Sequence, residues 1–122
     1  MGYRSNVGLC LSKNGVSLLK QKLGKLDWKT MSDVKDLLNY PDAHFIDVDT
    51  GCELWYWTWL KWYVDYPDVS FIENTLLDMD TEDFLFIRIG DDSDDNDIQG
   101  DFWENPFDMG FSRSIEFEKS GV

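Results

Sequence analysis

Residues 54–63 read LWYWTWLKWY, and this run constrains the fold more than any other segment. If the run is extended, large apolar side chains lie on both of its faces, although three of its tryptophans also fit helical spacing. The run follows Asp-Thr-Gly at 49–51, a turn whose glycine can adopt a positive φ. Because aromatic enrichment after such a turn favours a strand, we expect a β-hairpin formed by residues 43–48 and 52–63.

One face of this aromatic strand is expected to lie in the core. Aromatic side chains on a sheet can stack nucleic-acid bases, but such platforms come with a basic groove, whereas the neighbours here include Glu53 and Asp65. Trp and Tyr are favoured anchors at protein interfaces. The hypothesis left open for the second face is therefore a protein-binding aromatic patch of Trp55, Trp57 and Trp59, without direct contact to nucleic acid.

Apolar spacing and capping residues predict three helices. Asn14 offers an N-cap for the first helix, which is expected to end at Gly24. Thr30 and Asp33 form a pair similar to a capping box at the start of the second helix. Pro67 suits the first turn of the third helix, because its fixed φ is compatible with that position.

Three further strands are predicted at residues 3–11, 84–89 and 110–118, and residues 90–109 form a long connection that is either functional or mobile. The 122 residues, 43% apolar and 16% aromatic, suffice for one core. We therefore expect a single α+β domain in the order β-α-α-β-β-α-β-β. Its sheet should be mainly antiparallel with helices packed on it, and a long acidic loop should precede the last strand.

Charge is divided unevenly along the chain. Residues 1–35 carry seven Lys/Arg and two Asp, a net charge of +5, whereas residues 36–122 carry four Lys/Arg and 22 Asp/Glu, a net charge of −18. Such a density of carboxylates repels nucleic acid and attracts cations or basic proteins. We therefore predict that the acidic segment binds a partner protein with a basic surface. The predicted partner-binding residues are Asp78, Asp80, Glu82, Asp83, Asp91, Asp92, Asp94, Asp95, Asp97, Asp101 and Glu104.

Several short segments carry a family resemblance. They are Met-Gly-Tyr-Arg-Ser at 1–5, Lys-Trp-Tyr at 61–63, Phe-Ile-Arg-Ile-Gly-Asp-Asp at 86–92 and Arg-Ser-Ile-Glu at 113–116. With these segments the chain resembles a family of short, largely uncharacterised phage and prophage proteins that open with the same five residues. The resemblance implies a phage or prophage origin and an α+β domain acting inside a bacterial host. It implies no activity and no functional residue.

The cytoplasm of the host is the expected location. No apolar run of signal-peptide length follows the N-terminal arginine, and no segment approaches the ~20 apolar residues of a membrane span. Cys10 and Cys52 are too few for a disulfide framework and are expected to be small buried strand residues.

Calcium binding is the first chemical alternative for the acidic segment. Aspartates at 95 and 97 followed by Gln99 and Gly100 reproduce the opening spacing of an EF-hand loop. The position that requires a bidentate glutamate is Pro106, so the match fails there and a solvated acidic loop is the simpler interpretation. We expect no metal and no cofactor.

The three arginines, Arg4, Arg88 and Arg113, all fall in predicted strands. If those strands are neighbours, the guanidinium groups could converge on a phosphate or carboxylate ligand. The simpler alternative is that nearby Asp and Glu side chains pair with them on a sheet face.

Enzyme signatures are few. His44 is the single histidine, with no serine or cysteine motif around it, and Asp47 and Asp49 are spaced for a metal but lie before a turn, where such pairs are common. The leading hypothesis is therefore a non-enzymatic, phage-encoded inhibitor or modulator that binds a host defence or replication protein through an acidic surface similar to the phosphates of DNA. The alternatives are a binding or self-assembling module that uses the aromatic strand or the opposite charges of two copies, and a metal-dependent enzyme.

Overall fold

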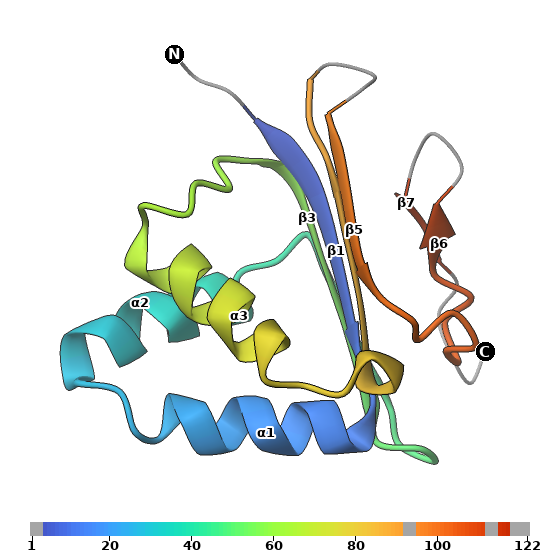
Figure 1. Cartoon of the computed structure of the whole chain (residues 1–122), viewed down its shortest axis with the longest axis horizontal. Coiled ribbons are helices and arrows are strands. Elements are labelled where there is room, and N and C mark those ends of the chain that lie inside the picture. Colours follow the sequence, from blue (N-terminus) through green and yellow to red (C-terminus); the bar gives the residue numbers. More distant parts are fainter. Residues whose placement is uncertain (1–3, 92–94, 112–114, 118–122) are drawn as a thin grey trace.

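The computed structural model describes residues 4–91, 95–111 and 115–117. Three helices cover one side of a sheet, and the C-terminal segment covers the other side (Figure 1). In chain order the elements are β1 (Ser5–Leu11), α1 (Lys13–Leu23), α2 (Trp28–Asn39), β2 (Ala43–Asp47), β3 (Cys52–Leu60), α3 (Pro67–Leu77), the short 3₁₀ helix η1 (Thr81–Asp83), β4 (Phe84–Ile89), β5 (Asn96–Gly100), β6 (Gly110–Phe111) and β7 (Ile115–Glu116).

The main sheet has five strands in the order β2-β3-β1-β4-β5, and every neighbouring pair is antiparallel. The predicted α+β class with an antiparallel sheet is therefore confirmed. The hairpin of β2 and β3 is also confirmed, and Gly51 in its turn has a φ of 77°, which glycine adopts without steric cost. Strand β1 lies at the centre of the sheet and pairs with β3 on one side and β4 on the other.

One face of the sheet packs against the helices. The buried side chains on this side include Leu9 and Leu11 of β1, Trp55 and Trp57 of β3, and Ile72 of α3. Val69, Ile72 and Leu76 of α3, and Met79 just after it, are all buried. Burial of these aliphatic and aromatic groups is the main force that holds the helices on the sheet.

The opposite face of the sheet is covered by the segment after β5. Phe107, Met109 and Ile115 pack on Leu85 and Ile87 of β4, and all five are buried. Both faces of the central strands are therefore buried, which explains why most side chains of β1 and β4 are apolar.

Gly8 allows this second layer to approach β1. A Cβ atom at position 8 would lie 2.9 Å from Cγ2 of Ile115 and 3.0 Å from Sδ of Met109. Cys10 and Cys52 are buried on the same side and are not disulfide-bonded, as predicted for small strand residues. Burial raises the pKa of the Cys10 thiol far above its usual range, so this group is held in the neutral form.

Two helix starts differ from the predictions. The N-cap of α1 is Ser12, whose hydroxyl oxygen accepts a hydrogen bond of 3.1 Å from the N–H of Gly15, and Asn14 lies inside the helix. Helix α2 begins at Trp28 and is capped by Asp27, whose carboxylate accepts from the N–H of Thr30. Hydrogen bonds from the side chain of Thr30 and from its backbone N–H lower the pKa of Asp27. Thr30 is therefore in the first turn rather than at the cap.

The predictions for the C-terminal third need two corrections. Residues 90–109 are not one loop, because β5 pairs with β4 from Ile89 opposite Asn96 to Leu85 opposite Gly100. Residues 110–118 do not form one strand: β6 and β7 are two short strands that pair with each other in a separate sheet. Arg113 lies outside the described residues.

Candidate functional site

The predicted acidic residues lie in two groups. The first group follows α3 and includes η1, and the second surrounds β5. Asp78, Asp80, Glu82 and Asp83 belong to the first group, and Asp91, Asp95, Asp97, Asp101 and Glu104 belong to the second. The N–H of Asp101 donates to the carbonyl of Thr81 at 2.7 Å, so the two groups meet at the end of β5. Asp92 and Asp94 lie outside the described residues.

Two members of the first group have partners inside the protein. The carboxylate of Asp78 forms an ion pair with Lys22 of α1. The Asp83 carboxylate accepts a hydrogen bond of 2.8 Å from the hydroxyl of Ser12, the N-cap of α1. Asp78 therefore links α1 to the end of α3, and Asp83 links the start of α1 to η1. The ion pair with Lys22 offsets the unfavourable position of the Asp78 charge at a helix C-terminus.

Arg88 is the basic residue at the centre of the acidic region. Between Asp78 and Glu104 the sequence has eleven Asp or Glu residues and no other Lys or Arg. The two terminal nitrogens of Arg88 donate to the two carboxylate oxygens of Asp95 at 3.2 and 2.9 Å, and one also donates to the hydroxyl of Ser5 at 3.2 Å. This bidentate pair bridges β4 and the start of β5, as the simpler interpretation of the arginines predicted.

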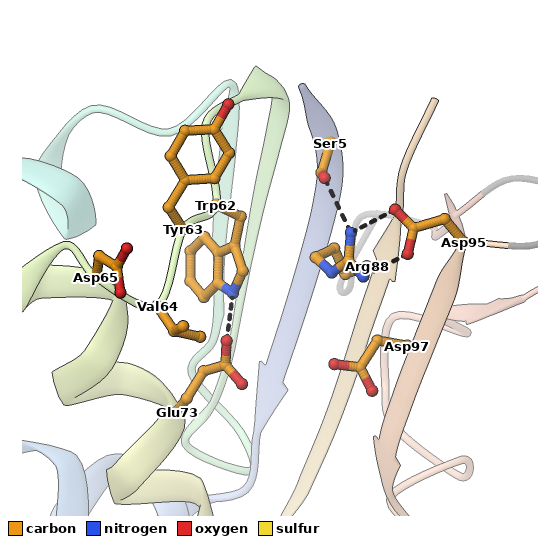
Figure 2. A pocket seen from close by; sticks show the side chains of 9 residues that line it. All are labelled: Ser5, Trp62, Tyr63, Val64, Asp65, Glu73, Arg88, Asp95 and Asp97. Carbon is orange, nitrogen blue, oxygen red and sulfur yellow. Dashed lines mark hydrogen bonds and ion pairs between the residues drawn. The ribbon is translucent and has the colours of Figure 1, made fainter. Parts of the chain in front are cut away.

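A cleft of about 460 Å³ opens beside this pair. Figure 2 shows Trp62 and Glu73 on one side of it, and Arg88, Asp95 and Asp97 on the other. Ser5, Tyr63, Val64 and Asp65 complete its lining. The cleft thus has four carboxylates and one guanidinium, and that guanidinium is already paired.

Aromatic packing fixes the position of Trp62 in this cleft. Its ring centroid is 5.9 Å from that of Trp57 and 5.6 Å from that of Phe86, and its indole N–H donates to the carboxylate of Glu73 at 3.0 Å. The aromatic wall and the nearby carboxylates form a combination that suits a cationic side chain, since a cation is attracted to both. Glu73 was not predicted as a site residue, and Trp62 was considered only as part of the aromatic run, because only the tertiary fold brings the segment after β3 next to α3.

The cleft continues along α3 as a smaller cavity of about 220 Å³. The two cavities share Val64 and Glu73, and the second one adds Leu77 of α3 and Gln99 of β5. A groove therefore runs between α3 and the helix-facing side of β5.

The predicted aromatic patch is wrong for two of its three residues. Trp55 and Trp57 are 4% and 3% exposed, and their indole N–H groups donate to the backbone carbonyls of Leu38 and Leu37. They bury their rings beneath α2, because the helices cover this face of β3. Trp59 is 69% exposed and has a φ of 57°, a conformation that turns it out of the strand alternation at an irregularity between β1 and β3.

Two of the candidate catalytic and metal residues, His44 and Asp47, have structural partners. Nε2 of His44 lies 2.9 Å from a carboxylate oxygen of Glu53, and its ring stacks on Trp55 at a centroid distance of 4.8 Å. The Asp47 carboxylate accepts from the hydroxyl of Thr50 within the hairpin turn. Among the described residues, no group of three His, Cys, Asp or Glu side chains is placed to hold a metal ion.

The segment compared with an EF-hand loop is extended, because residues 96–100 form β5. In a strand, carboxylates two residues apart are about 6.6 Å apart along the chain and do not wrap around one ion. The calcium-loop interpretation is therefore not compatible with the observed backbone.

No family model matched this chain, and no curated protein or solved structure gave a significant match to it. In the described part of the chain, no helix combines the length and the apolar character needed to cross a membrane.

Proposed function

We propose that this protein is a non-enzymatic binding protein whose acidic face, formed by β5 and its flanks, occupies a basic surface of another protein. The observation that carries the proposal is the charge around the cleft: four carboxylates line it, and its one guanidinium is already engaged by Asp95 and Ser5. The field of such a face attracts a basic surface and speeds association with it.

The nature of the partner follows from the phage-like sequence segments. A phage protein with this chemistry is suited to inhibit or modulate a host defence or replication protein at a basic, nucleic-acid-binding surface. Asp80, Glu82, Asp101 and Glu104 are exposed and extend the negative charge beyond the cleft. A duplex carries one phosphate charge per about 1.7 Å of axis, so a surface evolved for phosphates is a natural target for this one.

The test compares two triple variants that remove the same charge from different faces. The first removes exposed or half-exposed carboxylates around β5: Asp97→Asn, Asp101→Asn and Glu104→Gln. The control removes exposed carboxylates of α2 and the hairpin turn: Asp33→Asn, Asp36→Asn and Asp49→Asn. Tagged proteins capture partners from bacterial lysate at low salt, and the affinity for the captured partner is then measured.

We expect the β5 triple variant to lose at least tenfold in affinity, and the control to stay within about twofold because screening limits the influence of distant charges. Equal losses in both variants would mean that only net charge matters. That result would refute a specific acidic binding face.

A second copy of the chain is the alternative partner. Lys13, Lys20 and Lys25 are exposed on or beside α1, so the basic part of one copy could contact the acidic face of another. Light scattering at low and high salt tests this alternative: a mass that falls with added salt supports it, and a monomer at both salts excludes it.

A further inference from the structure

Strand β5 is the last strand of the main sheet, and within the described residues no strand pairs with its outer side. An edge strand carries backbone N–H and C=O groups that another chain can pair with. The orientation of those groups in β5 can be worked out from the ladder that it forms with β4.

The N–H of Gly90 donates to the carbonyl of Asp95 at 2.8 Å. Continuation of the register makes these two residues opposite each other, so they form a hydrogen-bonded pair. Such pairs alternate along an antiparallel ladder, and therefore Asp97 and Gln99 also bond to β4. The N–H and C=O of Ile98 point the other way, outward from the sheet.

The side chains beside this edge differ between the two faces. Asp97 and Gln99 face the groove along α3, where Val64 and Leu77 are 63% and 76% exposed. Ile98 lies on the other face, opposite Ile87, and is 41% exposed. A strand added at the edge would place every second side chain beside Asp97 and the groove, and the others beside Ile98.

We propose that an extended segment of a basic partner pairs with the outer edge of β5 as a sixth strand. This inference rests on the proposed function and specifies how the partner binds. Main-chain hydrogen bonds to Ile98 supply affinity, while alternate Lys or Arg side chains contact Asp97 and Glu73 in the groove.

Charge determines which occupant fits. Acidic residues at a sheet edge discourage pairing with a similar strand, and the β5 strands of two copies would bring like charges together. A basic segment reverses the sign of that interaction. The acidic edge is therefore selective for a basic strand rather than closed to all strands.

The probe for this proposal is a synthetic peptide of about ten residues in which lysine alternates with valine. Its affinity is measured by calorimetry, and amide hydrogen exchange of the protein is followed with and without it. We expect the peptide to bind and to slow exchange at the amide of Ile98.

The decisive variant is Ile98→Pro. It removes an outward N–H without removing a bond to β4, so the sheet should persist, since proline is tolerated on an edge strand with its nitrogen toward solvent. Affinity for the peptide should fall at least about tenfold, because two edge hydrogen bonds are lost or distorted. Ile98→Ala retains the backbone groups and should change affinity by less than about threefold.

If Ile98→Pro does not fold, the edge hydrogen bonds are removed from the peptide instead of from the protein. A peptide N-methylated on its pairing edge should lose affinity for the wild-type protein to the same degree. Equal binding of methylated and unmethylated peptides would refute strand addition.

The outcomes separate this inference from the proposed function. Peptide binding that is lost on Asp97→Asn but unchanged in Ile98→Pro would refute strand addition and leave the acidic binding face standing. Absence of peptide binding to the wild-type protein would count against both. A dimer that Ile98→Pro dissociates would identify a second copy as the occupant and overturn the choice of a basic partner.

Discussion

Replacement of Asn105 by alanine should loosen the layer that covers the second face of the sheet. The side chain of Asn105 is 4% exposed and closes the turn that leads from β5 to β6. Its Nδ2 donates to the carbonyls of Phe102 and Met109 at 2.9 and 3.1 Å, and its Oδ1 accepts from the N–H groups of Phe107 and Met109 at 3.2 and 2.8 Å.

The magnitude follows from what alanine leaves behind. The N–H groups of Phe107 and Met109 would lose their acceptor in a buried environment, and each unpaired buried group costs about 1–3 kcal/mol. Water entering the vacated space relieves part of this, so we expect a loss of about 3 kcal/mol in the free energy of unfolding. With an unfolding entropy of about 2.1 cal/mol/K per residue over 122 residues, Tm should fall by roughly 12 °C.

Thermal and urea unfolding followed by circular dichroism measure this change. Glu104→Ala, an exposed neighbour in the same turn, is the matched control and should shift Tm by less than about 2 °C. If Asn105→Ala shifts Tm no more than the control does, the side chain of Asn105 does not order the second layer. Residues 101–109 would then behave as the loop that the sequence predicted.

Three further predictions concern the sheet and its charges. Asp95→Asn should lower the free energy of unfolding by about 1–2 kcal/mol in urea titrations, because it breaks the partly exposed, charge-assisted pair with Arg88. Asp97→Asn should change the free energy of unfolding by less than about 0.5 kcal/mol. Equal effects would contradict a structural role for Asp95 and a binding role for Asp97. Gly8→Ala should lower the free energy of unfolding by about 1–3 kcal/mol through overpacking, while Gly110→Ala should leave it nearly unchanged, because a Cβ at position 110 meets nothing within 4 Å. A larger loss of stability in Gly110→Ala than in Gly8→Ala would exclude the close approach of the second layer to β1. Cys10 should resist thiol reagents in the native protein at pH 8 and react once the protein is unfolded. Because its native pKa is raised, the stability that Cys10 contributes is complete below about pH 8.5, the ordinary thiol pKa, and declines at higher pH. Rapid labelling of the native protein, or an unfolding midpoint that does not change between pH 8 and 10, would contradict the burial of this thiol.

Local signals in the sequence were sufficient for the elements that depend on few residues. Pro67 marked the start of α3, and Asp-Thr-Gly at 49–51 marked the hairpin. Ser12 was missed as a cap because Asn14 is an equally good cap residue by type. The choice between them depends on the hydrogen bond from Ser12 to Asp83, which lies 71 positions away.

Strand β5 could not be predicted from its own residues. Asn96 to Gly100 contains one β-branched side chain and ends in glycine, so its propensity for a strand is low. It is extended because β4 offers an open edge and Arg88 holds Asp95 at its start. Tertiary contacts therefore override local preference in the segment that carries the acidic face.

The acidic face itself was predictable in composition but not in detail. Counting charges located the carboxylates, but could not show that Asp78, Asp83 and Asp95 have partners in the fold. The aromatic run was predicted as a strand, yet burial of Trp55 and Trp57 depends on α2 lying above them. Which face of a strand is covered is a property of the whole fold.

The most direct test of the acidic binding face is the salt dependence of affinity for the captured partner, measured in the wild-type protein and in the triple variant Asp97→Asn, Asp101→Asn and Glu104→Gln. We predict that wild-type affinity falls steeply between low and high salt, and that the variant binds at least tenfold more weakly with a shallower salt dependence, since fewer charges take part. Equal affinity and equal salt dependence for the two proteins would contradict the proposed role of this face.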